Sequence, residues 1–407
     1  MSIRPLDLNP SHCFVDGTWK PSQSGQTLPL VDPSTGHTLC EIARGQAGDI
    51  NAAIEAATRA SRRTWGQSTA VERGRILYRL GELVLENADQ LARIEAMDVG
   101  KPLKQARADV MALARYMEFY AGAADKVHGA TVPYLTGYTV YTLREPHGVT
   151  GHIVPWNYPM QIIGRSVGAA LAMGNACVLK PAEEACLTAL AFVELGRRAG
   201  LPDGVLNVVP GLGAEAGAAL SSHAGVHHLS FTGSVAVGRL VQQAAGQNVV
   251  PVTLELGGKS PQVVFDDADI EAALPFLVNA GIQNAGQTCS AASRTLVQRG
   301  VYAQVSDAMA QRYRALKVGP ALDDLDVGPL ISGRQKQIVE EYLRQGSDLE
   351  IAAQGTITPR APDTGAYVKP TLFIDVPPQH VLAQQEIFGP VQVIIPFEDE
   401  GEALEIS

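Results

Sequence analysis

Alternating strand and helix patterns between Val149 and Leu256 constrain the fold of this chain more than any other feature. Short apolar segments, such as Val149–Val154 and Ala176–Lys180, are each followed by a stretch with helical periodicity. This alternation predicts a parallel, doubly wound sheet covered by helices, and such sheets bind ligands at the carboxyl ends of their strands. Similar units continue after Gly257, so we expect a second α/β domain.

The segments before Val149 predict a scaffold and a projecting ribbon. Residues 12–47 have the pattern of short strands, and helical periodicity follows from Asp49, the predicted N-cap, to about Val127. Residues 131–147 return to alternation, which predicts an exposed two-stranded ribbon. Because an isolated two-stranded ribbon is barely stable, we expect it to pack on another subunit.

Composition and charge exclude several classes of function. A chain of 407 residues has room for two or three domains, and its formal net charge is −10. The sequence has no basic run with interleaved aromatic residues, which argues against binding to nucleic acid or to an anionic membrane surface. The apolar run Gly168–Leu179 is too short to span a bilayer.

The five cysteines are scattered at positions 13, 40, 177, 186 and 289, with no metal-ligand spacing. Such a set indicates a reducing compartment rather than a disulfide framework, and we expect no metal site. Residues 1–7 lack the apolar stretch of a secretory signal. We therefore predict a soluble, cytoplasmic protein.

Cys289 is the candidate nucleophile. It lies among small and polar residues in the segment 284–291, where the pattern indicates a loop that meets a helix. A thiol attacks as its thiolate, and a helix N-terminus or a nearby positive charge lowers the thiol pKa. A buried structural cysteine is the alternative, so the prediction depends on partner groups elsewhere in the chain.

Two side chains could supply those partner groups. Asn157 lies in a loop fixed by Pro155 and Pro159, where its amide could donate to a developing oxyanion. Glu255 precedes two glycines and could act as a general base on water. The alternatives are a turn asparagine bonded to its own backbone and a carboxylate paired with Lys259.

Several further motifs predict a dinucleotide. Lys180 and Glu183 could hold ribose hydroxyls, and the carboxylate favours NAD over NADP. The glycine-containing turns 211–217 and 231–234 could present backbone amides and a helix N-terminus to a pyrophosphate. The segment 386–390 offers a second ribose ligand and an aromatic ring. Capped helices, a surface ion pair and an ordinary turn are the alternatives.

Six motifs that follow one another along the chain carry a family resemblance. They are Val154-Pro-Trp-Asn157, Lys180-Pro-Ala-Glu183, Phe231-Thr-Gly-Ser234, Glu255-Leu-Gly-Gly-Lys259, Gly286-Gln-Thr-Cys289 and Glu386-Ile-Phe-Gly-Pro390. In sequence and spacing this set resembles the NAD(P)-dependent aldehyde dehydrogenase superfamily. The resemblance extends from about residue 12 to the end.

The resemblance implies a role for each motif. Cys289 would attack an aldehyde to give a thiohemiacetal and then a thioester, Asn157 and the Cys289 backbone N–H would hold the oxyanion, and Glu255 would activate the water that releases the acid. We expect NAD, rather than NADP, to be the cofactor. The residues expected to bind it are Val154, Pro155, Trp156, Lys180, Glu183, Gly213, Gly217, Phe231, Thr232, Gly233, Ser234, Leu256, Glu386 and Phe388.

The same resemblance implies the domain organisation. Residues 1–134 and 149–256 would form a Rossmann-like cofactor-binding domain, residues 135–148 a β-ribbon oligomerisation arm, and residues 257–407 an α/β catalytic domain. The expected assembly is a homodimer or homotetramer that acts on a small aldehyde.

The chain departs from the family pattern at its end. It stops within a predicted helix at Ser407, without the last part of the catalytic domain, so we expect a C-terminally truncated product. A relative that passes the acyl group to coenzyme A is one alternative, but Glu255 favours hydrolysis because a general base for water is dispensable there. An inactive truncated homologue that retains the fold is the other.

Overall fold

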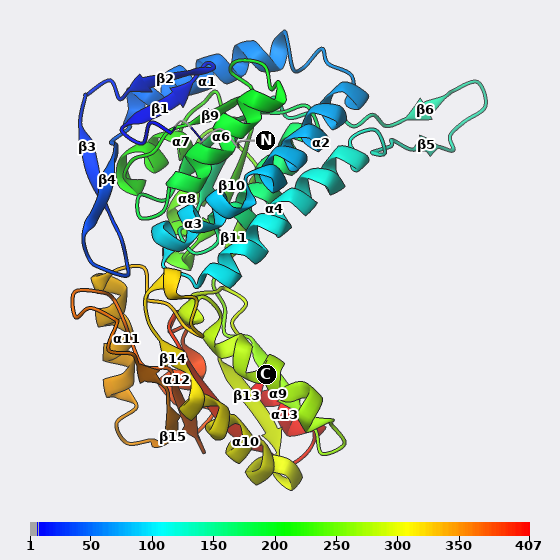
Figure 1. Cartoon of the computed structure of the whole chain (residues 1–407). Helices are drawn as coiled ribbons and strands as arrows, with labels where there is room; N and C mark the ends of the chain where they lie inside the picture. The colour runs from blue at the N-terminus through cyan, green and yellow to red at the C-terminus, as the bar shows by residue number, and fades with distance from the viewer. Residues whose placement is uncertain (1–5, 7) are drawn as a thin grey trace. The chain divides into compact units, whose positions relative to one another are not determined.

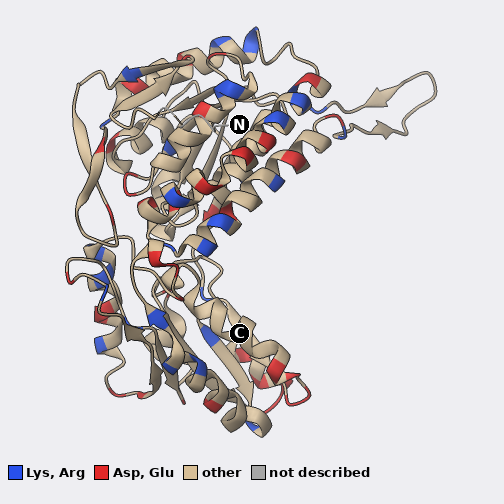
Figure 2. Cartoon of the chain, in the orientation of Figure 1, with Lys and Arg blue, Asp and Glu red and all other residues tan. Residues whose placement is uncertain are grey.

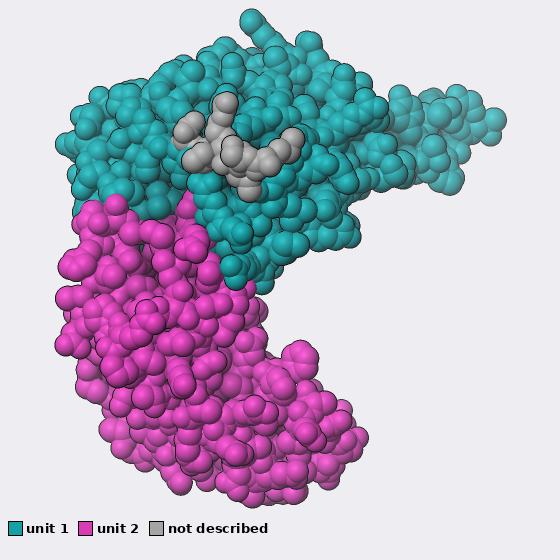
Figure 3. All heavy atoms as spheres, in the orientation of Figure 1, with its two compact units in different colours: residues 1–30, 40–92, 107–255 teal, residues 31–39, 93–106, 256–407 magenta. Residues whose placement is uncertain are grey.

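The structure, a computed structural model, describes Leu6 and residues 8–407. The predicted lack of a secretory signal concerns residues 1–7, which, apart from Leu6, lie outside the described residues. The chain forms two compact units, coloured separately in Figure 3. Unit 1 comprises residues 1–30, 40–92 and 107–255, and unit 2 comprises residues 31–39, 93–106 and 256–407.

Unit 1 is built on a seven-stranded sheet with the order β11-β10-β7-β8-β9-β1-β2 (Figure 1). Its central strands β10, β7, β8 and β9 are parallel, and the β1–β2 hairpin adds an antiparallel edge. The predicted doubly wound parallel sheet is therefore confirmed. The strands are β1 (His12–Val15), β2 (Thr18–Pro21), β7 (Val149–Val154), β8 (Ala176–Pro181), β9 (Leu206–Val208), β10 (His228–Gly233) and β11 (Val252–Leu256).

Helices follow the strands of unit 1 as the periodicity predicts. They are α1 (Ala47–Arg62), α2 (Ala70–Glu86), α5 (Pro159–Ala172), α6 (Leu187–Ala199), η1 (Gly213–Gly217), α7 (Ala218–Ser221) and α8 (Val235–Gly246). Two further helices, α3 (Ala88–Val99) and α4 (Leu103–Ala123), each contribute residues to both units. Apolar residues at helical spacing on α1, among them Ile50, Ile54 and Ala57, are fully or almost fully buried.

The start of α1 differs from the prediction. Gln46, and not Asp49, is the N-cap residue, because the helix begins at Ala47. Asp49 lies in the first turn and accepts a hydrogen bond from the Gln46 backbone N–H at 2.9 Å. The carboxylate thus completes a capping box from inside the helix, a position that sequence preference alone does not separate from the N-cap.

A two-stranded ribbon projects from unit 1 (Figure 1). Its strands β5 (Thr131–Val132) and β6 (Val140–Tyr141) are antiparallel, with Thr131 opposite Tyr141. The predicted ribbon is confirmed, although its paired strands are only two residues long. A second two-stranded sheet pairs β3 (Thr27–Val31) with β4 (Thr38–Ala43).

Unit 2 contains the second α/β sheet that the sequence predicts, in the order β12-β13-β18-β17-β15. Strands β12 (Pro261–Val264), β13 (Arg294–Gln298), β18 (Val391–Phe397) and β17 (Thr371–Ile374) are parallel, and β15 (Glu350–Gln354) is antiparallel to β17. Its other elements are α9 (Ile270–Ile282), η2 (Gln283–Gly286), η3 (Arg299–Val301), α10 (Tyr302–Ala315), β14 (Lys317–Val318), η4 (Ala321–Asp323), α11 (Gly333–Gln345), β16 (Thr356–Ile357), α12 (Val381–Gln384) and α13 (Glu400–Ile406). Fully buried side chains of β13 and β18, such as Leu296, Ile394 and Phe397, form the centre of its core.

Charged side chains of both signs are interspersed over the two units (Figure 2). Within Leu6 and residues 8–407, no helix combines the length and the apolar character that crossing a membrane requires.

Candidate active site

The chain reverses its direction of winding at β7 in unit 1. From β7, the sheet continues through β8 and β9 on one side, whereas β10 pairs with β7 on the other. Loops that leave two such strands diverge and form a crevice at the carboxyl edge of the sheet, where ligands bind. The register places Val154 beside Pro181 and Phe231 beside Ile153, so three predicted motifs reach this edge together.

Asn157 lies in the bend that connects β7 to α5. Its side chain is buried, with 6% of the residue exposed. Pro159 occupies the first turn of α5 and Pro155 follows β7 directly, so the backbone is restricted on both sides of Asn157. The structure therefore agrees with an amide that is held in place at the carboxyl edge. Trp156 lies in the same bend and is partly buried.

Lys180, Glu183 and Gly213 form one cluster at the end of β8. The buried Lys180 Nζ lies 2.8 Å from a Glu183 carboxylate oxygen, and the other oxygen accepts from the Gly213 backbone N–H at 3.3 Å. Burial alone would raise the pKa of Glu183, but the Lys180 ammonium and the hydrogen bonds together hold it below its usual range. The carboxylate is therefore ionised and fixed. Gly217 ends η1, close behind in the chain.

Ser234 connects β10 to α8 as the N-cap. Its hydroxyl accepts a hydrogen bond from the Val237 backbone N–H at 3.3 Å, and the preceding residues Thr232 and Gly233 end the strand. The predicted strand–glycine–helix turn is present, so the N-terminus of α8 lies at the carboxyl edge. Such a terminus attracts anions.

Glu255 lies in the last strand of unit 1. Its side chain is exposed on β11, the edge strand that pairs with β10, and Leu256, the next residue, begins the last segment of unit 2. An exposed carboxylate on an edge strand is accessible to water.

Two candidate residues of unit 2, Cys289 and Glu386, and Lys259, which follows β11, lie in loops at the amino ends of three strands. Lys259 precedes β12, Cys289 precedes β13 and Glu386 precedes β18. These strands are parallel neighbours, and Arg294 pairs with both Pro261 and Val393. The three loops therefore meet at one edge of the sheet.

The turn at Gly257 and Gly258 lies close to both the Glu386 loop and the Cys289 loop. A side chain on Gly257 would overlap the Glu386 carboxylate, and one on Gly258 would come within 3.8 Å of the Cys289 carbonyl oxygen. The Gly258 backbone N–H also donates a hydrogen bond to Glu386. Glycine at position 257 thus permits the close approach of the Glu386 carboxylate, whereas a side chain at position 258 would make only an ordinary contact.

The loop before Cys289 has an unusual backbone. Asn284, Ala285 and Gly286 have φ values of 49°, 54° and 73°, so three successive residues are left-handed. This run ends the helix that precedes the loop, and Cys289 lies in a turn that leads into β13. The predicted loop therefore meets a helix on its N-terminal side, and β13 follows it. A strained backbone of this kind is typical of functional sites.

Buried amides hold the strained loop. Gln287 is fully buried; its Nε2 donates to the Asn284 carbonyl at 2.9 Å, and its Oε1 accepts from the Ile331 N–H at 2.9 Å. The Asn284 N–H in turn donates to the Gln105 side chain at 2.8 Å. The contributions of Gln105 and Ile331 could not be predicted from the sequence, because the residues that they bond to, Asn284 and Gln287, are far away in the chain.

The loop that carries Glu386 packs on the same segment. Phe388 has a φ of 55°, and its carbonyl accepts from Gln335 Nε2 at 2.9 Å. A side chain on Gly286 would overlap the Gly389 carbonyl, so the two loops are in direct contact. The structure therefore brings the Cys289 and Glu386 motifs together.

Cys289 differs from the other cysteines in its exposure. It is exposed, whereas Cys13, Cys177 and Cys186 are buried and Cys40 is intermediate. Burial raises the pKa of Cys13 and Cys177 to about 12, which leaves them almost entirely as inert thiols at neutral pH. The buried-cysteine alternative therefore does not describe Cys289.

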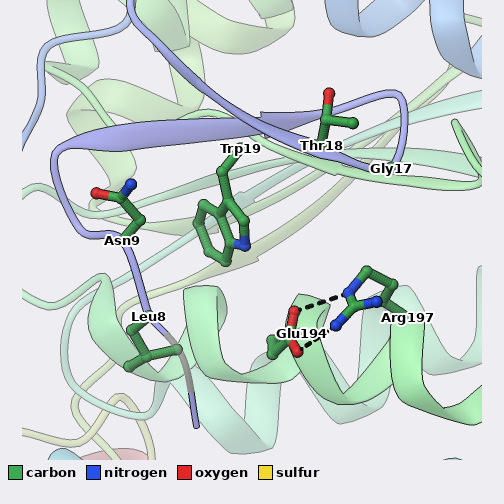
Figure 4. Close-up of a pocket in the computed structure, with 7 residues that line it drawn as sticks. All are labelled: Leu8, Asn9, Gly17, Thr18, Trp19, Glu194 and Arg197. Atoms are coloured by element: carbon green, nitrogen blue, oxygen red, sulfur yellow. Dashed lines mark hydrogen bonds and ion pairs between the residues drawn. The ribbon is translucent and has the colours of Figure 1, made fainter.

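An open cavity elsewhere on unit 1 is not part of this arrangement (Figure 4). It is lined by Trp19 of β2, Glu194 and Arg197 of α6 and four neighbours. Glu194 is already bonded to Arg197 at 2.8 and 3.0 Å, and none of the predicted site residues lines the cavity.

Comparisons with known proteins give a consistent result. The model of the aldehyde dehydrogenase family matches residues 19–407. The hydroxyisobutyraldehyde dehydrogenase of Mycolicibacterium austroafricanum is 44% identical over 388 residues, which cover 95% of this chain and 77% of the relative. The benzaldehyde dehydrogenase of Antirrhinum majus is 40% identical over 404 residues, 98% of this chain and 76% of the relative.

Comparison with solved structures gives the same family. A protein of Burkholderia cenocepacia, whose crystal structure is described as that of an aldehyde dehydrogenase, has a TM-score of 0.96 and 57% identity, with 97% of this chain and 84% of that chain covered. The NAD+ complex of an aldehyde dehydrogenase from Bacillus cereus has a TM-score of 0.94 and 38% identity, with 98% and 82% covered. The chain belongs to the aldehyde dehydrogenase family, and it is an oxidoreductase that converts an aldehyde to a carboxylic acid with a nicotinamide dinucleotide.

Proposed function

We propose that Cys289 is the nucleophile of this oxidation. The observation that carries the proposal is an exposed thiol on a strained loop, held by Gln287 and packed against the Glu386 loop. Attack of the thiolate on the aldehyde carbon forms a C–S bond and moves the carbonyl electron pair to oxygen. Asn157 and the Cys289 backbone N–H donate hydrogen bonds to that oxyanion.

Glu255 completes the reaction as a general base. Loss of hydride from the thiohemiacetal carbon leaves a thioester on Cys289. Glu255 takes a proton from water while the water oxygen attacks the thioester, and the C–S bond breaks to release the carboxylic acid and the thiolate. The exposure of Glu255 on an edge strand supports this role.

Two groups of residues fit a nicotinamide dinucleotide. Lys180 and Glu183, with Gly213, suit the adenosine ribose, and the N-terminus of α8 at Ser234 suits the pyrophosphate. Glu386 Oε1 is buried and has no hydrogen-bond partner among the described residues, as an acceptor for a hydroxyl of the nicotinamide ribose should be. The bound nicotinamide would supply the acceptor for the released hydride.

The remaining predicted cofactor residues belong to the same segments. Val154, Pro155 and Trp156 follow or end β7, Phe231, Thr232 and Gly233 end β10, Gly217 ends η1, and Leu256 and Phe388 adjoin Glu255 and Glu386. We propose that all of them line the cofactor.

NAD is the proposed form of the cofactor. The ionised Glu183 carboxylate would accept hydrogen bonds from the ribose 2′-hydroxyl, whereas it would repel the 2′-phosphate of NADP. The NAD+ complex of the Bacillus cereus relative supports this choice.

The assembly, domain roles and location are also proposals. The exposed apolar ribbon at 131–141 supports an oligomer, a homodimer or homotetramer. We assign cofactor binding to residues 1–134 and 149–256 and catalysis to residues 257–407. Five free cysteines support a reducing cytoplasm, which fractionation of the native cells tests.

An aldehyde panel tests the proposed function. We expect NADH formation from NAD+ with aliphatic, hydroxylated or aromatic aldehydes, because the names of the relatives include aldehydes of these classes. Cys289→Ala should abolish turnover while NAD+ still binds. Unchanged NADH formation by this variant would disprove the role of Cys289.

A further inference from the structure

Lys259 is a buried cation that the proposed reaction does not use. It lies in the turn between β11 and β12, and its Nζ is buried, with no hydrogen-bond partner among the described residues. An ammonium group carries three donors and is unfavourable in a buried position without an acceptor. The Lys259 ammonium therefore needs a neighbouring carboxylate or a bound ligand to offset the cost of its burial.

The carboxylate whose charge acts on Lys259 is that of Glu386. Its Oε1 is likewise buried without a hydrogen-bond partner in the described part of the chain, and the carboxylate packs against Gly257 and accepts from the Gly258 N–H. Burial raises the pKa of Glu386, which the Gly258 N–H and the Lys259 charge oppose. Burial also lowers the pKa of Lys259 to about 8, with Arg294 adding to the effect and Glu386 opposing it.

Arg294, the other cation at this edge, is committed elsewhere. Its Nε donates to the Lys259 carbonyl at 2.9 Å, and its two terminal nitrogens donate to the carbonyls of Ile406 and Ser407 at 2.8 and 2.6 Å. Arg294 thus fixes the backbone of Lys259. The groups that act on Glu386 are the Gly258 N–H and the Lys259 charge, both from the turn before β12, whereas Arg294 of β13 acts on Lys259.

We propose that Lys259 is a positioning residue for the cofactor: its buried ammonium, on the turn that packs against Glu386, keeps the unpartnered Oε1 of that carboxylate an acceptor for a hydroxyl of the nicotinamide ribose. The inference rests on the proposed role of Glu386 in cofactor binding. A carboxylate accepts with both oxygens, whereas a protonated carboxyl group donates with one of them. Loss of the Lys259 charge therefore favours the protonated form of Glu386, which binds the ribose less well.

The consequence is a change in the pH dependence of NAD+ binding. The pKa of Glu386 is raised in the free protein, so protonation competes with NAD+ as the pH falls towards that value. Without the Lys259 charge the pKa of Glu386 rises further, and the competition begins at a higher pH. Binding at high pH, where Glu386 is ionised in both proteins, should differ little.

Isothermal titration of NAD+ into the intact protein between about pH 5.5 and about pH 8.5 tests this inference. We expect Lys259→Met to weaken binding several-fold at the acidic end, to move the midpoint of the pH profile upward, and to approach the wild type at the alkaline end. Lys259→Arg retains the charge and should restore the wild-type midpoint. Glu386→Gln should bind NAD+ weakly at every pH, and adding Lys259→Met to it should change nothing.

Three outcomes would overturn the proposal: a Lys259→Met profile that superimposes on the wild type, a Lys259→Arg variant as weak as Lys259→Met, or an additional loss in the double variant. Circular dichroism checks the fold of each variant, and Lys259→Gln serves if Lys259→Met fails to fold. Wild-type NADH formation with aldehydes tests the proposed function separately, since NAD+ binding is measured here without substrate.

Discussion

At the scale of single residues, the proposed reactivity of Cys289 rests on the exposure of its thiol and on the backbone of its loop. Five cysteines occur in the chain, and the structure separates them by burial. A thiol with a pKa of about 12, as in Cys13 and Cys177, forms roughly three orders of magnitude less thiolate at neutral pH than an ordinary exposed cysteine.

Alkylation should therefore be selective. With iodoacetamide at neutral pH, peptide mapping should find Cys289 modified first, with loss of activity in proportion, while Cys13 and Cys177 stay unmodified until the protein unfolds. Cys40→Ala is the control, since this partly exposed residue should contribute little to inactivation. Modification of Cys177 before Cys289 would contradict the assignment.

At the scale of elements, the loop before Cys289 depends on a left-handed backbone and on close packing. Gly286 has a φ of 73°, and its Cα faces the Gly389 carbonyl. Both conditions exclude a side chain. The same loop is tied to Ile331 and to Gln105 through buried amides.

Gly286→Ala should disturb this loop. Backbone strain at positive φ costs about 1–3 kcal/mol, and the overlap with Gly389 adds to it, so we expect a lower free energy of unfolding in urea and slower alkylation of Cys289. Gly333→Ala is the matched control, because Gly333 also lies in unit 2 and a side chain there meets nothing within 4 Å. Its unfolding free energy should stay within about 0.5 kcal/mol of the wild type. Equal stability of the two variants would contradict the packing argument.

Much of the element order could be predicted from sequence, because the relevant signals are local. The apolar segments that became β7, β8 and β10 alternate with helical periodicity, and the motifs mark their ends. The edge on which Lys259, Cys289 and Glu386 lie could not be predicted, since it depends on pairing between strands distant in the chain. The left-handed run Asn284–Gly286 could not be predicted either, because alanine at position 285 gives no signal for a positive φ, although asparagine and glycine both adopt it.

The hydrogen bonds of Gln287 that hold the Cys289 loop could not be predicted, for a related reason. Gln287 and Ile331 are 44 positions apart, and the contact uses a backbone N–H, which any residue except proline can supply. A glutamine in a polar segment looks like a loop residue until its burial is known. The candidate residues themselves could be named from the motifs, whereas their supports needed coordinates.

At the scale of the whole molecule, the ribbon of unit 1 is the feature that points to an assembly. Residues 129–143 contain no charged side chain, and Tyr134, Leu135, Tyr138 and Leu143 are each more than 60% exposed. Apolar side chains on a ribbon that cannot bury them mark an interaction surface.

Charges placed on the ribbon should therefore reduce the assembly. We expect Tyr138→Asp combined with Leu143→Asp to lower the molar mass measured by light scattering after size-exclusion chromatography. Val71→Asp, an equally drastic change at an exposed apolar residue of α2, should leave the mass unchanged. A mass that the ribbon variant does not alter would refute the oligomerisation role.

The most direct test of the proposed chemistry is the time course of NADH formation by Glu255→Gln in a stopped-flow instrument. Oxidation precedes hydrolysis, and only hydrolysis needs a general base. We predict a rapid burst of about one NADH per Cys289, followed by a steady state at least about 100-fold slower than in the wild type. A steady-state rate equal to that of the wild type, or a variant with no burst, would contradict a thioester on Cys289 that Glu255 helps to hydrolyse.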